Sequence, residues 1–261
     1  MAGRVLIGQT LVVVAPHHTA QRRGLPPRDV RRIIGRRVTQ VVRRAKHQHL
    51  VLDDGAIIAV HFRMNGDWVV GRVRDPLPPY ARVVFETKRG ARLSLVDSRA
   101  LCSVIYHAPN ALPQLALGPE PEALTATALR RALEARRGPI KPLLLDQRVV
   151  AGLGNIYAAE ALWRSRIHPA RTAGSLTMPE LRALVRGIRH AIADGFARQG
   201  RYRSGALERP FRVYDREGHP CPRCRQPVRR ISQAGRSTYF CASCQSHGPS
   251  ARPRARRPVA P

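Results

Sequence analysis

Residues 141–163 read KPLLLDQRVVAGLGNIYAAEALW, and this stretch decides the fold of the second half of the chain. Its first leucines and valines predict a short helix with one apolar side, and Gly152 and Gly154 predict a tight turn because glycine adopts backbone angles that other residues resist. Asn155 is a natural N-cap for a second helix. The first turn of a helix leaves N–H groups unpaired, so both an ordinary helical hairpin and an anion-binding turn fit the pattern.

The charge of the chain points to a polyanionic partner. Its 261 residues include 46 Lys and Arg but only 17 Asp and Glu, which gives a formal net charge of +29. Arginine supplies most of this excess, and its planar guanidinium pairs with phosphate through two hydrogen bonds. We therefore predict that the partner is nucleic acid. The alternative is a basic surface that reflects solubility or codon bias.

A membrane partner is not expected. No stretch approaches the roughly 20 apolar residues that a helix needs to cross a bilayer. The mostly apolar residues 5–14 are interrupted by Gln9 and Thr10, which favours a buried strand over a signal peptide. We expect a cytoplasmic protein.

Residues 1–110 are predicted to form a β-sandwich or flattened barrel. Short apolar segments alternate there with turn signals such as Asn65-Gly66. The candidate strands cover residues 5–14, 38–43, 49–52, 57–62, 68–73, 82–86, 92–96 and 103–106. One short helix is predicted at 27–34, and the proline-containing residues 111–122 are typical of a linker.

From residue 123 the hydrophobic period becomes helical, and the fold class is therefore α+β. Helices are predicted at 128–136 and 178–197 in addition to the two in residues 141–163, and Thr177 with Glu180 predicts a capping box. The predicted C-terminal domains are a helical domain at 123–208, a zinc ribbon at 209–247 and a disordered basic tail at 248–261.

Four of the five cysteines form two CxxC motifs, and these are Cys221, Cys224, Cys241 and Cys244. The sixteen residues between the motifs are typical of a four-cysteine zinc site. Strands at 228–232 and 237–240 would form a β-hairpin fixed at its base by one structural zinc ion. Such a hairpin either contacts DNA or is purely structural. The fifth cysteine, Cys102, is expected to be a core residue.

The amino-acid sequences of two segments resemble those of one known family. Residues 141–163 closely resemble the helix–two-turn–helix (H2TH) of the formamidopyrimidine-DNA glycosylase/endonuclease VIII family, and PCPRC…GRSTYFCASCQ resembles its zinc finger. The similarity covers about residues 117–245 and extends more loosely back to residue 6. The family combines a β-rich N-terminal half, an H2TH domain and a zinc hairpin in this order.

The resemblance implies base-excision repair. Family members flip an oxidised base, such as a formamidopyrimidine, 8-oxoguanine or an oxidised pyrimidine, out of duplex DNA and remove it. They then cut the strand at the abasic site through a Schiff base and β-elimination. The expected partner is double-stranded DNA with damaged or abasic sites, and the expected protein is a bacterial monomer that associates with the nucleoid when it binds DNA.

The resemblance also implies roles for single residues. Lys141 and Asn155 match residues that hold phosphates near the lesion, and Arg236 matches a hairpin arginine that grips phosphate. Lys46 matches the lysine beside the reacting sugar. Lys46 and Arg236 are the catalytic candidates, although Lys46 also fits the description of a solvated surface cation.

Three further residues match the part of the family that fills the gap in the DNA. Met64, in the segment HFRMNG, matches a methionine that enters the void left by the flipped base. Arg99 matches an arginine that faces the orphaned base, and Leu101 stands where the family usually has an aromatic wedge. Each of these is also compatible with an ordinary packing or surface position. Three of the ten histidines, His47, His49 and His61, could serve as metal ligands or bases, but the alternating strand pattern favours packing or surface positions for them.

The chain departs from the family at its first residues. Family enzymes begin Met-Pro-Glu; the proline amine, whose pKa is lower than that of lysine, attacks the sugar, and the glutamate transfers protons. This chain reads Met-Ala-Gly-Arg, and the helix that carries proline and glutamate is expected to be missing. Ala2 is then a weak substitute for the amine. The alternatives are an enzyme with a misplaced start and a catalytically dead protein that binds damaged DNA. The polar residues 200–208 also look shorter than the lesion-capping loop of the family.

Overall fold

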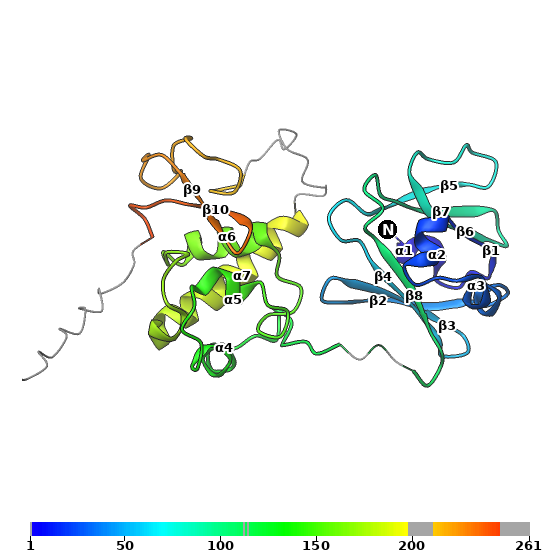
Figure 1. Cartoon of the computed structure of the whole chain (residues 1–261), viewed down its shortest axis with the longest axis horizontal. Coiled ribbons are helices and arrows are strands. Elements are labelled where there is room, and N and C mark those ends of the chain that lie inside the picture. Colours follow the sequence, from blue (N-terminus) through cyan, green and yellow to red (C-terminus); the bar gives the residue numbers. More distant parts are fainter. Residues whose placement is uncertain (1, 112, 114, 198–210, 246–261) are drawn as a thin grey trace, which may run out of the picture. The chain divides into compact units, whose positions relative to one another are not determined.

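The structure is a computed structural model that describes residues 2–111, 113, 115–197 and 211–245 (Figure 1). The chain divides into two compact units, residues 1–116 and 117–261. Each unit is described by itself. The predicted basic tail at 248–261 and the polar residues 200–208 lie outside the described residues.

The N-terminal unit is a sandwich of two antiparallel four-stranded sheets, as predicted. The first has the order β1-β6-β7-β5, with β1 (Leu11–Pro16), β5 (Asp67–Arg72), β6 (Ala81–Thr87) and β7 (Ala91–Val96). The second has the order β2-β3-β4-β8, with β2 (Val38–Arg44), β3 (His47–Leu52), β4 (Ile57–His61) and β8 (Ser103–His107). Leu50 and Ile58 of one sheet and Phe85 and Leu93 of the other are fully buried in one core, because alternate residues of each strand face the opposite sheet.

The first residues of the chain do not form the predicted strand. Helix α1 (Ala2–Leu6) precedes β1, so the strand predicted at 5–14 is wrong in its first half. Ala2 and Leu6 lie four residues apart on one side of this helix, and both are buried in the sandwich core. This short helix contains neither proline nor glutamate, the two residues of the family helix that is expected to be missing. A short apolar run fits either element until its neighbours are known.

Two more short helices belong to the N-terminal unit, α2 (His18–Arg22) and α3 (Pro27–Ile33). The second of these was predicted, and Pro27 suits the first helical position because proline has no N–H to leave unpaired. Cys102 is 2% exposed in the sandwich core, which confirms its predicted place.

The C-terminal unit contains α4 (Ala126–Leu133), α5 (Ile140–Leu144), α6 (Asn155–Arg164) and α7 (Met178–Ala197), with a 3-10 turn η1 (Ala173–Ser175). Helices α6 and α7 approach closely at Gly187, where a Cβ atom would lie 2.8 Å from the carbonyl oxygen of Ala161. The predicted pairing at the start of α7 is present, since Thr177 N donates to Glu180 Oε2 at 2.8 Å. No helix in the described part of the chain is long and apolar enough to cross a membrane.

A β-hairpin completes this unit. Strand β9 (Arg229–Gln233) pairs with β10 (Arg236–Phe240), and the turn residues Ala234 and Gly235 both have positive φ, 48° and 70°. Two consecutive residues with positive φ match the twist of a two-residue hairpin. Strand β10 packs against α6 (Figure 1), so the hairpin lies on the helix–turn–helix.

Candidate nucleic-acid interface and metal centre

The turn between α5 and α6 is held by its own side chains. Gly152 has φ 79°, the left-handed conformation that glycine permits at little cost. Its N–H donates to Gln147 Oε1 at 2.9 Å, and Arg148 N donates to Asp146 Oδ1 at 3.0 Å. The loop therefore reaches the start of α6 in one defined conformation.

The N-terminus of α6 carries no side-chain cap. Gly154 is the N-cap, with φ −107° and no capping hydrogen bond, so the prediction that Asn155 caps this helix is wrong by one residue. Gly154 also does not need the left-handed region. Because no side chain caps this end, its partial positive charge is available to an anion.

The side chain of Asn155 is directed instead at the β-hairpin. Its Nδ2 donates to the carbonyl oxygen of Ser237 at 3.0 Å, and its Oδ1 accepts from Lys141 Nζ at 2.6 Å. Lys141 Nζ also donates to Thr238 Oγ1 at 2.7 Å and to the Ser237 carbonyl oxygen at 3.3 Å. We call these four residues the latch. It joins α5, the start of α6 and β10 within the C-terminal unit.

Lys141 is buried. Its side chain is 1% exposed and Thr238 is fully buried, whereas lysine is ordinarily a surface residue. The three acceptors are neutral, and Lys141 pairs with no carboxylate among the residues that the structure describes. Burial, and next the positive charge of Arg236, lower the pKa of Lys141 to about 8.

Arg236 is the first residue of β10 and lies beside the latch. Its residue pair across the hairpin is Gln233, at the turn. It is exposed and pairs with no carboxylate among the described residues, whereas Arg230 pairs with Glu217 at 3.3 Å. A guanidinium free of carboxylates at a hairpin turn suits contact with phosphate.

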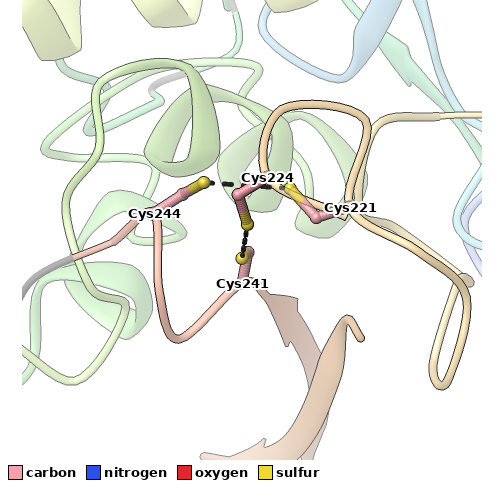
Figure 2. A group of neighbouring side chains, drawn as sticks. All are labelled: Cys221, Cys224, Cys241 and Cys244. Atoms are coloured by element: carbon pink, nitrogen blue, oxygen red, sulfur yellow. Dashed lines mark hydrogen bonds between the residues drawn. The ribbon is translucent and has the colours of Figure 1, made fainter. Parts of the chain in front are cut away.

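The two CxxC motifs converge on one site. Figure 2 shows the four thiols meeting from two loops, one before β9 and one after β10. All four Sγ atoms lie within 4.8 Å of one another, with Cys221 Sγ 3.9 Å from Cys244 Sγ and Cys224 Sγ 3.4 Å from Cys241 Sγ. Thiolates bound tetrahedrally at about 2.3 Å from zinc lie about 3.8 Å apart. The cluster therefore fits one structural zinc ion.

Side chains around the cysteines join the zinc module to the helical part of the unit. Trp163 Nε1 donates to Cys221 Sγ at 3.4 Å, and the Arg223 guanidinium lies 4.2 Å from the centre of the Trp163 ring. Gln245 is 1% exposed, accepts from Cys241 N at 2.8 Å and donates to the Ile167 carbonyl oxygen at 2.9 Å. Such partners orient ligands and shield a metal site. The sequence prediction missed the roles of Trp163 and Gln245, because no local pattern links either residue to the cysteine sulfurs.

A buried carboxylate fixes the segment that leads into the zinc module. Glu160 of α6 is 3% exposed and accepts from the N–H groups of Arg212, Val213 and Tyr214 at 2.9, 2.9 and 3.1 Å. Charge-assisted bonds of this kind satisfy a buried charge. Helix α6 thus contacts the zinc module along its whole length, from Asn155 through Glu160 to Trp163. The sequence prediction missed Glu160 as well.

In the N-terminal unit the structure brings Met64 and Arg99 together. Met64 is 73% exposed, and Arg99 Nη1 lies 3.3 Å from its Sδ. The loop that carries Arg99 and Leu101 is held by Asp97, which is 1% exposed and accepts from the N–H groups of Arg99, Leu101 and Cys102 at 3.0, 2.7 and 2.8 Å. An exposed methionine beside an arginine on a rigid loop contradicts a core role for Met64.

Lys46 lies in the turn between β2 and β3, next to a group of histidines. It is half-buried and follows Ala45, which has φ 53°. His47 and His61 pair across β3 and β4 with ring centres 4.6 Å apart. Burial first, then the charges of His47, Arg63 and Lys46, lower the pKa of His61 to about 4, so its imidazole is neutral at pH 7. Within the described residues the side chains that group as possible metal ligands are the four cysteines, which supports packing rather than metal binding for these histidines.

Ala2 does not lie at the surface, where an exposed amine would have to be. Its side chain is fully buried in α1, inside the sandwich core. Lys46, Met64, Arg99 and Leu101 belong to one unit, and Lys141, Asn155 and Arg236 belong to the other. The structure therefore forms two groups of candidate residues, one in each unit.

Together, an uncapped helix terminus, an exposed hairpin arginine and a four-cysteine centre define a zinc-containing nucleic-acid-binding fold, and comparison with known proteins specifies which one. Residues 2–104 match the model of the formamidopyrimidine-DNA glycosylase N-terminal domain, residues 115–204 match the formamidopyrimidine-DNA glycosylase H2TH domain, and residues 218–246 match the zinc finger found in FPG and IleRS.

Named relatives cover most of the chain. The formamidopyrimidine-DNA glycosylase of Chloroflexus aggregans is 42% identical over 84% of this chain and 85% of its own length. That of Rhodospirillum rubrum is 40% identical over 92% of this chain and 94% of its own length. The chain belongs to the formamidopyrimidine-DNA glycosylase family.

Solved structures agree. The MutM (Fpg) protein of Thermus thermophilus has a TM-score of 0.82 and 35% identity over 94% of this chain and 95% of its own. Lactococcus lactis Fpg, solved with DNA that contains N7-benzyl-Fapy-dG, has a TM-score of 0.85 and 26% identity over 94% and 95% of the two chains. The same Lactococcus protein has been solved with DNA that contains an abasic site, with a TM-score of 0.84 and 25% identity over the same shares.

Proposed function

We propose that this chain is a base-excision-repair DNA glycosylase that binds double-stranded DNA at damaged or abasic sites, removes oxidised bases and cuts the strand at the abasic site. The observation that carries the proposal is the latch, because it places the open N-terminus of α6 and the exposed Arg236 beside each other on one surface. A helix terminus and a guanidinium are both phosphate-binding groups. The family membership and the DNA-bound relatives support the choice of damaged DNA as the ligand.

The residues are assigned as follows. Arg236 and the first turn of α6 at Asn155 hold phosphates of the damaged strand, and Lys141 acts in the same region. Met64 enters the void left by the flipped base and Leu101 acts as a wedge, while Arg99 faces the orphaned base. The contact of Arg99 with Met64 supports a shared task, since both must act on the same gap in the duplex.

The chemistry requires an amine. A neutral amine attacks C1′ of the damaged nucleotide, and the base departs with the electron pair of its glycosidic bond and takes up a proton. The C1′–O4′ bond then opens, with its electron pair and a proton going to O4′, and leaves a protonated imine at C1′. This imine allows loss of a C2′ proton and elimination of the 3′ phosphate. Lys46 is our candidate for that amine or for a positive charge beside the sugar. Its turn is basic, which attracts the phosphates that flank a lesion.

Zinc has a structural role. The four cysteines would hold it, and it supplies folding free energy to the hairpin that carries Arg236. No step of the reaction passes through it. We further propose that the protein acts as a monomer in the cytoplasm, where it meets the chromosome.

Borohydride trapping on a duplex with one abasic site tests the proposal, with excision measured in parallel on a duplex that contains 8-oxoguanine. We expect a covalent adduct and base release from the wild type, both lost in Lys46→Ala and kept in Lys88→Ala, which removes an exposed lysine of the β6–β7 turn. An adduct that survives Lys46→Ala would reject Lys46 as the amine and leave the N-terminus, Lys88 and Lys141 as candidates.

The second candidate function is a catalytically dead protein that binds damaged DNA. The burial of Ala2 favours it, since an amine at that position does not face solvent in the structure. Tight binding to the abasic duplex with neither adduct nor base release would replace the glycosylase with this binder. Absence of binding would reject both.

A further inference from the structure

Lys141 has no hydrogen-bond donor left for a phosphate. Its side chain is 1% exposed, and its Nζ donates to Asn155 Oδ1, Thr238 Oγ1 and the Ser237 carbonyl oxygen at 2.6, 2.7 and 3.3 Å. A lysine ammonium has three N–H donors. All three therefore end on groups of the protein, and a phosphate would have to displace one of them inside a closed site.

The acceptors come from distant parts of the sequence. Asn155 is 14 residues from Lys141, whereas Ser237 and Thr238 are 96 and 97 residues away. Asn155 Nδ2 also donates to the Ser237 carbonyl oxygen at 3.0 Å. The latch therefore fixes the N-terminus of α6 against β10 at the residue that follows Arg236.

We propose that Lys141 is a positioning residue that docks the zinc hairpin on the helix–turn–helix, so that Arg236 and the N-terminus of α6 face neighbouring phosphates, and that Lys141 itself touches no phosphate. The ligand in this statement rests on the proposed function. The docking of the hairpin does not, because every bond of the latch is internal to the protein.

The energetics support a role in docking. A buried cation without a carboxylate partner costs free energy unless each donor is satisfied. Removing the ammonium leaves Asn155 Oδ1 and Thr238 Oγ1 without their donor, and unsatisfied buried acceptors destabilise the arrangement that creates them. Lys141→Met keeps the length and the apolar stem of the side chain and removes only the donors and the charge.

A salt titration of binding to an abasic duplex separates docking from direct contact. Each phosphate contact contributes about 0.9 to the slope of log Kobs against log salt concentration. The variants are Lys141→Met, Arg236→Gln, the double variant and the matched control Lys88→Met. We expect Lys141→Met and Arg236→Gln each to lower the affinity on the order of tenfold, as for the loss of one charged hydrogen bond. The double variant should bind no more weakly than Arg236→Gln alone.

Two results would overturn the proposal. Additive losses, with the slope falling by about 0.9 for each substitution, would show that Lys141 contacts a phosphate itself. Affinity of Lys141→Met equal to that of Lys88→Met would show that docking does not depend on Lys141. A general loss of stability would lower the affinity but leave the slope of log Kobs against log salt concentration unchanged. It therefore cannot produce the expected non-additive effect of the Lys141 and Arg236 substitutions.

Hydrogen exchange without DNA tests the docking independently of the function. At equal zinc content, we expect faster exchange of amides 236–240 in Lys141→Met and in Thr238→Val, which removes one acceptor at constant shape, and no change in Lys88→Met. Unchanged exchange in both latch variants would overturn the proposal. Faster exchange in a protein that binds no damaged DNA would reject the proposed function and leave the docking role standing.

Discussion

Trp163 donates its indole N–H to Cys221 Sγ at 3.4 Å, so the C-terminal half of α6 supplies a hydrogen bond to the zinc centre. Arg223 stacks on the same ring and donates to the Trp163 carbonyl oxygen at 3.2 Å. A thiolate that accepts a hydrogen bond is stabilised, and the ring covers one side of the cluster. The zinc module is therefore an extension of the helix–turn–helix rather than an independent appendage.

Trp163→Phe should accelerate zinc loss. The substitution keeps an aromatic ring but removes the hydrogen bond to Cys221, and partners of metal ligands typically contribute on the order of tenfold to affinity. Zinc release to a chelator, followed with a chromogenic indicator, measures the effect. Trp68→Phe is the matched control because Trp68 donates to Gln48 Oε1 in the other unit. Equal release from both variants would show that the hydrogen bond does not hold the metal.

Asp97→Asn should destabilise the N-terminal unit by about 1–3 kcal/mol. Asp97 is buried and accepts three backbone N–H groups, whereas an amide offers one oxygen and brings an NH₂ group to a site filled with donors. Urea unfolding followed by Trp68 fluorescence measures the change. Asp53→Asn, at an exposed turn residue, should change stability by less than about 0.5 kcal/mol. A similar effect of the two substitutions would contradict the role of Asp97.

The same loop connects stability to function. Because Asp97 holds the backbone of Arg99 and Leu101, Asp97→Asn should also weaken their proposed action on the gap in the DNA. Binding to an abasic duplex should fall, while binding to undamaged duplex DNA should stay close to that of the wild type.

Gly187→Ala should force α6 and α7 apart. Its Cβ would lie 2.8 Å from the Ala161 carbonyl oxygen, which is backbone and cannot turn away. We expect a loss of about 1–3 kcal/mol in the free energy of unfolding, as for other overpacked cores. Gly138→Ala is the control, because its Cβ would meet no atom within 4 Å. The helix contact is less tight than described if thermal unfolding gives equal midpoints for the two variants.

Lowering the pH should destabilise the N-terminal unit already in the range where histidines take up protons, above the pH at which carboxylates are protonated. Burial is the first cause of the lowered pKa of His47, His49 and His61, and it brings that of His61 to about 4. The unfolded chain binds these protons near pH 6.5 and the folded unit does not. The stability present above pH 6.5 is therefore lost as the pH falls from 6.5 towards 4.

Urea midpoints at pH 7.5, 6 and 5 measure this dependence. His61→Gln should flatten it, because one of the groups that take up protons on unfolding is gone. Gln40→Ala, at an exposed position of β2, should leave the wild-type dependence unchanged because it removes no titratable group. A steep dependence that persists in His61→Gln would place its origin elsewhere.

Several features could be predicted because they depend on short-range geometry. Each strand from β2 to β8 begins and ends within about two residues of its prediction, since alternation and turn residues act over neighbouring positions. The predicted helix at 178–197 has the bounds of α7, and the zinc cluster follows from the spacing of two CxxC turns. The errors at α1 and at Gly154 concern one turn of backbone, where local signals are ambiguous.

The β-sandwich, the helix–turn–helix, the zinc ligands and the polyanionic class of partner could all be predicted from the residues, because periodicity, turn chemistry and charge are local or additive properties. The burial of Lys141, the direction of the Asn155 side chain towards β10 and the contact of Trp163 with Cys221 could not. These three features depend on contacts between residues that are far apart in the sequence. From its sequence neighbours alone, Lys141 is expected to be a surface cation. Its acceptors include a strand residue 96 positions away, and no local sequence pattern predicts that contact.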